Sequence, residues 1–266
     1  MRKKGIGLVI ALLMLAVTVI PVAAITWGQP DTEHTNVGAM VADYPGYGPY
    51  QVCSGTLVHP RVVLTAGHCT VDWEGTGVET FWVNFDPYAL NEDTLHLVEE
   101  VIPHPDYWWG PTSNPYDVGV LVLAEPVKDI EPANLPDEGL LEDLLDAGLL
   151  KHGVKRAKFT AVGYGGLLEW PPPDIYYEDM RQYADSEFQN LHKIWLRLSQ
   201  NQATGNGGTC FGDSGGPIFW TAEDGMETLV AVTSWGDAVC VSAGFNYRVD
   251  IADTLDFITE VIDDLD

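Results

Sequence analysis

Basic residues are scarce in this sequence: 13 Lys and Arg stand against 39 Asp and Glu among 266 residues, a formal net charge of −26. We expect no binding to nucleic acid, because proteins hold the phosphate backbone with clusters of Lys and Arg. A high net charge keeps a protein in solution and is also used by proteins of saline habitats, and the composition fits both.

Metal-binding patterns are absent as well. There is no C-x-x-C and no H-x-x-x-H spacing, so we expect neither a metal site nor a cofactor. The four cysteines, Cys53, Cys69, Cys210 and Cys240, form an even set. In an exported chain such a set predicts disulfides, and the residues alone leave three pairings open.

Only one long hydrophobic run occurs, and it lies near the start of the sequence. After three basic residues the chain is apolar from Gly5 to about Ile20, and it then reads Val22-Ala23-Ala24. This pattern is typical of a signal peptide, which we predict over residues 1–24. We therefore expect a secreted protein of charge −29 without stable membrane association. The alternative is an uncleaved anchor, since about 20 apolar residues span a bilayer.

Long helical patterns are missing from most of the remaining chain, which is long enough for one large β domain or two small ones. Short β-rich runs dominate instead, separated by Gly, Pro and Asn. They are Ser54–Val58, Val62–Thr65, Phe81–Phe85, His96–Ile102, Val118–Leu123, Phe159–Tyr164, Pro217–Trp220, Leu229–Ser234 and Phe245–Val249. Such spacing predicts an all-β barrel or sandwich.

Three segments depart from this pattern. Glu138–Leu150 could form a short helix, and the Pro-rich stretch Trp170–Tyr183 is predicted to be a surface loop. Apolar residues recur at helical spacing near the end of the sequence, with acidic residues between them. We therefore predict an amphipathic helix over about residues 250–266, docked by its apolar face.

No histidine follows Ser214, although seven precede it. Ser214 lies in Gly212-Asp213-Ser214-Gly215-Gly216-Pro217, a turn suited to a nucleophile. Its G-x-S-x-G pattern also occurs in α/β-hydrolases, but their catalytic histidine comes after the serine. The α/β-hydrolase interpretation is therefore excluded, and the lack of alternating helices opposes it independently.

The best candidate for a general base is His68, which follows the β-rich run Val62–Thr65 and precedes Cys69. The residue that orients such a base must be a buried carboxylate. Asp117 leads directly into an apolar run, where an acid is costly to bury without a partner. On spacing alone Asp117 remains one of several candidates.

Three segments together resemble the chymotrypsin/trypsin family of serine proteases. They are Thr65-Ala66-Gly67-His68-Cys69, Asp117-Val118-Gly119-Val120-Leu121 and Gly212–Pro217, in the family's order of His, Asp and Ser. The resemblance implies two six-stranded antiparallel β-barrels followed by a C-terminal α-helix. It places one protease domain over residues 25–266, with barrels at about 36–125 and 159–249 and a connector at about 126–158.

The resemblance also implies the roles of individual residues. Ser214 would be the nucleophile, His68 the base and then the acid, and Asp117 its orienting carboxylate. The backbone N–H groups of Gly212 and Ser214 would form the oxyanion hole. Disulfides Cys53–Cys69 and Cys210–Cys240 are implied in the same way.

Activation in this family usually pairs a new N-terminal ammonium with the aspartate before the serine, here Asp213. No Arg or Lys occurs between Lys4 and Arg61, which excludes activation by tryptic cleavage in that region. Signal-peptide cleavage after Ala24 would instead expose Ile25. We therefore expect secretion itself to create an Ile25–Asp213 pair.

For the specificity pocket, the resemblance implies a base at Gly208, without the aspartate of a trypsin-like enzyme. Gly236 and Gly244 would leave the pocket open to a large apolar side chain, which gains from burial. The implied substrate-binding residues are Gly208, Thr209, Ser234, Trp235, Gly236 and Gly244. We expect a monomeric endopeptidase for proteins or peptides that is not specific for Arg or Lys. A silent binding module on the same fold and an esterase with the same triad are the alternatives.

Overall fold

The computed structural model describes residues 25–71, 73, 75–108, 110, 113–151, 157–169, 174–177 and 179–265. The predicted signal peptide lies outside these residues, as do the prolines of the predicted surface loop. In the ranges given, no helix is both long and apolar enough to cross a membrane.

The first half of the chain forms a closed barrel of antiparallel strands. Its strands are β2 (Val37–Tyr44), β3 (Gly48–His59), β4 (Val62–Thr65), β5 (Phe81–Asn84), β6 (Leu95–Pro103) and β7 (Gly119–Leu123). They close in the order β2-β3-β4-β7-β6-β5. Leu57, Val63, Val83 and Leu121 are fully buried members of its core.

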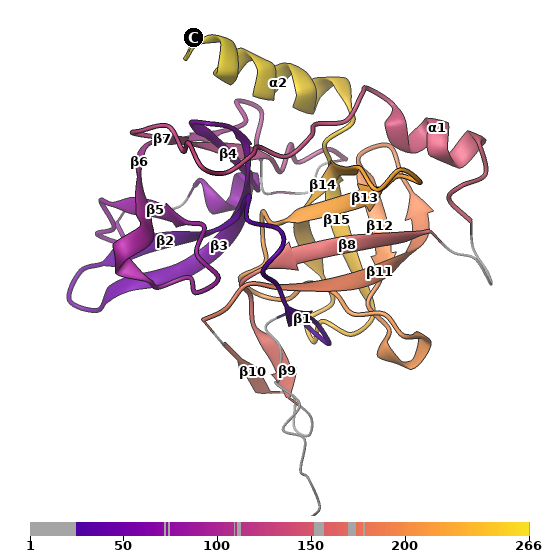
Figure 1. Ribbon diagram of the computed structural model, residues 1–266, viewed down its shortest axis with the longest axis horizontal. Helices are drawn as coiled ribbons and strands as arrows, with labels where there is room; N and C mark the ends of the chain where they lie inside the picture. The colour runs from indigo at the N-terminus through magenta and orange to yellow at the C-terminus, as the bar shows by residue number, and fades with distance from the viewer. Residues whose placement is uncertain are drawn as a thin grey trace, which may run out of the picture.

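The second half forms another closed barrel beside the first (Figure 1). Its strands are β8 (Lys158–Gly163), β11 (Gln182–Leu191), β12 (Trp195–Ser199), β13 (Pro217–Thr221), β14 (Glu227–Gly236) and β15 (Ala243–Arg248). They follow the order β11-β12-β15-β14-β13-β8, and β8 pairs with β11 to close the ring. The short strand β1 (Gln29–Pro30) adds to β11. The predicted all-β fold with two six-stranded antiparallel barrels is confirmed.

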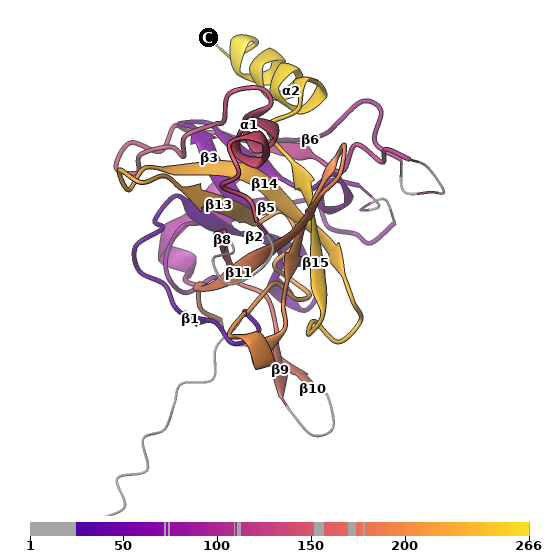
Figure 2. The same cartoon turned by 90° about the vertical axis from the view of Figure 1, so that its right-hand side faces the viewer.

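In the described part of the chain, two α-helices flank the barrels. Helix α1 (Leu140–Asp146) lies in the predicted connector, and α2 (Ala252–Asp263) follows the last strand. Helix α2 buries Phe257, Ile258 and Val261 in a core shared with residues of both barrels. It lies at the end of the molecule opposite the hairpin of β9 (Leu167–Glu169) and β10 (Asp174–Tyr176), as Figures 1 and 2 show. The predicted C-terminal helix is therefore confirmed.

The segment predicted as a surface loop, 170–183, differs from that expectation. Strand β10 lies within it, and β11 begins at Gln182. The alternation of β11 is hard to recognise in the sequence because two of its buried positions, beside Ala184 and Phe188, are occupied by the polar residues Gln182 and Ser186.

Polar contacts join the two barrels. Arg181, which immediately precedes β11, is completely buried and donates from Nη1 to the carbonyl oxygens of Val37 at 3.0 Å and Phe85 at 2.9 Å. The hydroxyl of Tyr164 donates to the Asp86 carbonyl oxygen at 2.8 Å. A buried arginine is costly without such acceptors, so these contacts fix one docking arrangement of the barrels.

Candidate active site

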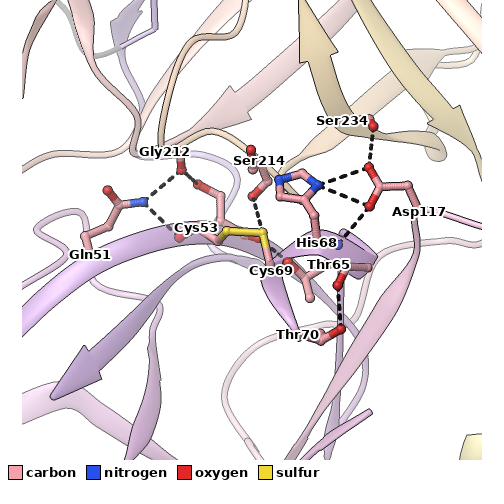
Figure 3. The surroundings of a disulfide bond; sticks show 12 residues. Gln51, Cys53, Thr65, His68, Cys69, Thr70, Asp117, Gly212, Ser214 and Ser234 are labelled. Atoms are coloured by element: carbon pink, nitrogen blue, oxygen red, sulfur yellow. Dashed lines mark hydrogen bonds and ion pairs between the residues drawn. A yellow bond between two sulfur atoms is a disulfide. The ribbon is translucent and has the colours of Figure 1, made fainter. Parts of the chain in front are cut away.

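His68 and Asp117 meet at the edge of the first barrel. His68 lies in a 3₁₀ turn, Gly67–Cys69, directly after β4, and Asp117 lies just before β7. Nδ1 of His68 is 3.1 Å from each carboxylate oxygen of Asp117, and the His68 backbone N–H donates to Oδ1 at 2.9 Å (Figure 3). These contacts bring together two of the three predicted catalytic residues.

Asp117 is fully buried and accepts a further short hydrogen bond from the hydroxyl of Ser234. Burial alone would raise the pKa of Asp117. Hydrogen bonds from His68 and Ser234 and the charge of His68 outweigh this effect and hold the pKa below its ordinary value. An ionised Asp117 accepts the Nδ1 proton of His68, which leaves Nε2 as the basic nitrogen of the ring.

Ser214 lies beside the His68 ring on the side away from Asp117 (Figure 3). Its carbonyl oxygen accepts from the Ser54 backbone N–H at 2.8 Å, so the first barrel holds the turn. The turn also requires glycine at position 215, where φ is +79°. A Cβ there would collide with Thr65 Oγ1 and lie 2.5 Å from the Ser54 carbonyl oxygen.

The backbone N–H groups of Gly212 and Ser214 remain available to a ligand. In the described part of the chain, neither group donates to a protein acceptor. The carbonyl oxygen of Gly212 is held by Gln51 Nε2 at 2.8 Å and by Ser54 Oγ at 3.0 Å. The turn is therefore anchored through its carbonyl groups, and the two predicted oxyanion donors are not consumed by internal hydrogen bonds.

Both implied disulfides are present. Cys53–Cys69 ties β3 to the turn that holds His68, and Cys210–Cys240 ties the segment before Ser214 to the segment after β14. His68 forms a cluster of potential metal ligands with Cys53 and Cys69, but the disulfide occupies both sulfur atoms.

Two cavities meet at His68 and Ser214. The smaller, of about 370 Å³, is lined by Thr209, Ser234, Trp235 and Gly236, among others. The larger, of about 840 Å³, contains the Cys53–Cys69 disulfide and several aromatic rings. These rings belong to Tyr44, Tyr50, Trp73, Tyr164, Tyr177 and Phe211. Both cavities are therefore within reach of a chain bound at Ser214.

Comparison with known proteins identifies the family of this chain. The trypsin family model matches residues 25–258. This chain belongs to the trypsin family. It is 30% identical over 200 residues to a trypsin of Saccharopolyspora erythraea, covering 73% of this chain and 79% of that protein.

Two animal relatives are similar at comparable levels. Kallikrein 1-related peptidase b24 of Mus musculus is 29% identical over 213 residues, covering 73% of each protein. CLIP domain-containing serine protease B15 of Anopheles gambiae is 27% identical over 210 residues, covering 71% of this chain and 55% of that protein. Membership of the trypsin family supports the predicted class of enzyme, a serine endopeptidase.

The predicted pocket residues of this trypsin-family chain separate into two groups. Thr209, Ser234, Trp235 and Gly236 line the smaller cavity, although the Ser234 hydroxyl is engaged with Asp117. Gly208 and Gly244 are not among its lining residues, and Gln200 packs against both. Gln200 was missed at the sequence level because no motif surrounds it.

Ile25 and Asp213 are both completely buried. The segment after Ile25 reaches the pocket segment, where the Gly208 N–H donates to the Thr26 carbonyl oxygen at 3.0 Å. The Asp213 carboxyl accepts from the N–H groups of Gly165 at 2.7 Å and Cys210 at 2.8 Å. Burial nevertheless raises its pKa to about 7. Among the described residues, no cationic side chain pairs with it.

Proposed function

We propose that this protein is a secreted serine endopeptidase with the catalytic triad His68, Asp117 and Ser214. The observation that carries the proposal is the position of His68, between a buried, ionised Asp117 on one side and Ser214 on the other. Membership of the trypsin family supports the peptidase class, and the arrangement of these three side chains supports the assignment of roles.

In the first half of the reaction, Ser214 Oγ attacks the carbonyl carbon of the scissile bond while His68 Nε2 takes the hydroxyl proton. The carbonyl oxygen becomes an oxyanion, which accepts hydrogen bonds from the Gly212 and Ser214 N–H groups. Asp117 keeps the proton of neutral His68 on Nδ1 and stabilises the imidazolium. His68 then passes its proton to the leaving nitrogen, and the C–N bond breaks to give an acyl-enzyme.

In the second half, a water molecule attacks the ester carbonyl of the acyl-enzyme and gives a proton to His68. Collapse of this intermediate breaks the bond to Ser214 Oγ, which regains the proton from His68. The products are a free carboxylate and an enzyme in its starting state. Each step requires only the groups already described at this site.

We propose that residues 25–266 form one monomeric protease domain, released by cleavage after Ala24. The new ammonium group of Ile25 would pair with Asp213, whose buried carboxyl has no cationic partner among the described residues. Disulfides persist in oxidising compartments, which supports an extracellular location. The resemblance places the base of the pocket at Gly208, which offers no carboxylate to an Arg or Lys side chain, so we propose that the enzyme is not specific for either.

Covalent labelling tests the assignment. A fluorophosphonate should label the secreted protein at Ser214, and Ser214→Ala should abolish both labelling and peptide hydrolysis. Ser113→Ala, at an exposed serine outside the site, is the matched control and should retain both. Labelling without hydrolysis of any peptide amide, together with rapid ester hydrolysis, would indicate an esterase. N-terminal sequencing of the active protein should begin at Ile25.

A further inference from the structure

Gln200 follows the last residue of β12 and is only 2% exposed. Its side chain lies where a residue larger than glycine at position 208 would project, since a Cβ there would collide with Gln200 Cγ and lie 2.7 Å from Nε2. A Cβ at Gly244 would lie 3.0 Å from the same nitrogen, and one at Gly236 would lie 3.8 Å from Oε1. The amide of Gln200 therefore occupies the space that these three glycines share.

The two ends of this amide are distinguished by their neighbours. Nε2 donates to the Thr209 carbonyl oxygen at 2.8 Å and to Thr209 Oγ1 at 3.2 Å, and only the nitrogen end can donate to a carbonyl group. Oε1 is buried and has no hydrogen-bond partner in the part of the chain that the structure describes. A buried acceptor without a donor costs free energy, so a ligand that supplies an N–H group to Gln200 Oε1 would be stabilised there.

Thr209 provides the complementary group. Its Oγ1 accepts the hydrogen bond from Gln200, and among the described residues its hydroxyl proton is donated to no other group. Thr209 lines the smaller cavity together with Gly236, the glycine nearest to Gln200 Oε1. Gln200 is not itself a lining residue, so its unused acceptor lies behind the cavity wall at Gly236, whereas the unused donor of Thr209 lies on the wall itself.

We propose, building on the function proposed above, that Gln200 and Thr209 select a carboxamide side chain, Gln or Asn, at the substrate residue preceding the scissile bond. The substrate amide would donate its N–H to Gln200 Oε1 and accept the hydroxyl proton of Thr209. A carboxamide is the only natural side-chain end that carries a neutral N–H donor and a carbonyl acceptor together.

Competing side chains fit less well. An Arg or Lys would lose its hydration without gaining a carboxylate at the end of the cavity. Asp237 also lines the cavity, but its carboxylate already accepts the N–H groups of Val241, Ser242 and Ala243. A large aromatic ring would leave Gln200 Oε1 unpaired, and the Gln200 side chain occupies the room beneath it.

The test compares kcat/KM for peptide substrates that differ only at the residue before the scissile bond: Gln, Met, Phe or Arg. Methionine matches glutamine in length but has no amide, so the wild-type enzyme should prefer Gln to Met by about tenfold or more. Gln200→Met keeps the volume and removes the acceptor, and it should bring this ratio close to one. Gln200→Ala should instead raise kcat/KM for Phe, because it empties the space beneath the cavity.

Fluorophosphonate titration of each variant counts working active sites independently of the substrate side chain. Loss of labelling in the wild-type protein would count against the triad, whereas normal labelling with Met or Phe preferred to Gln overturns the present proposal. If Gln200→Met fails to fold, the Gln-to-Met ratio of kcat/KM for the wild-type enzyme still decides whether a carboxamide is preferred. Thr209→Val, which removes the hydroxyl at nearly constant size, is a second variant. It should lower the Gln-to-Met ratio, and an unchanged ratio would refute the role of Thr209.

Discussion

The buried carboxyl of Asp213 predicts that cleavage before Ile25 changes how the stability of the protein depends on pH. Two inactive proteins carrying Ser214→Ala are compared, one beginning at Ile25 and one retaining Ala23 and Ala24 ahead of it. In the longer protein the charged ammonium group lies two residues away from Ile25, so Asp213 keeps its buried environment without a cationic partner.

The magnitude follows from the pKa of Asp213. Burial raises it, the N–H groups of Cys210 and Gly165 lower it in part, and the result is about 7 against an ordinary value of 3.8. Between these values the folded protein holds a proton that the unfolded chain has lost, so stability falls as the pH rises. The difference corresponds to about 4 kcal/mol of unfolding free energy, lost between about pH 4 and about pH 7. In the shorter protein the Ile25 ammonium group stabilises the carboxylate, and this loss should be largely absent.

Denaturation by urea, followed by tryptophan fluorescence over this pH range, measures both curves. All other titrating groups are common to the two proteins, so the difference between the curves reports Ile25 and Asp213. Asp213→Asn in the longer protein removes the titrating group and should flatten its curve. The reasoning is refuted if this variant keeps the slope of its parent, or if the two parent proteins have the same slope.

Three further predictions concern other parts of the molecule. Asp117→Asn should lower kcat for an amide substrate by about 10⁴-fold, the loss that this substitution causes in the trypsin family. Removing Cys210–Cys240 by paired Ser substitutions should destabilise the protein by about 4 kcal/mol in urea denaturation, because the bridge closes a loop with a sequence separation of 30. Burial lowers the pKa of His34, but carboxylates at both of its ring nitrogens raise it more. The stability that His34 contributes should be complete below about pH 6.5 and lost as the pH rises through the folded pKa, so His34→Gln should remove this part of the pH dependence.

The predicted site rests on residues whose chemistry depends on their immediate neighbours. A nucleophilic serine in a tight turn needs flanking glycines, and the collision that a Cβ at Gly215 would cause shows why this requirement appears in the local sequence. His68 and Asp117 were also recognised from adjacent residues: His68 precedes Cys69, and Asp117 leads into the apolar strand β7. Each of the nine β-rich runs predicted from composition also overlaps a strand of the structure.

Strands without a simple alternation were not recognised from the sequence. In β2, six consecutive residues from Val37 to Ala42 are buried, so one face does not differ from the other. In β11 the buried positions include Gln182 and Ser186, which look solvent-exposed in a linear reading. The family resemblance predicted a complete pair of barrels, although composition alone did not reveal all of their strands.

Gln200 escaped prediction for a different reason. The sequence indicated glycines at positions 208, 236 and 244, and glycine was interpreted as open space. In the structure a side chain from the end of β12 fills that space. Whether a glycine leaves a cavity or makes room for a distant residue is a property of the tertiary fold, and the neighbours of a glycine in sequence carry no information about it.

The position of the site between the barrels explains why so many internal contacts converge on one turn. His68 and Asp117 belong to the first barrel, whereas Ser214 belongs to the second, so the distance between nucleophile and base depends on how the barrels dock. Ser54 spans this boundary, with its N–H on the Ser214 carbonyl oxygen and its hydroxyl on that of Gly212. Each such hydrogen bond contributes only about 1 kcal/mol to stability. A misplacement of about 1 Å at a reacting group can cost about 100-fold in rate, so the main effect of these contacts is on catalytic geometry rather than on the stability of the fold.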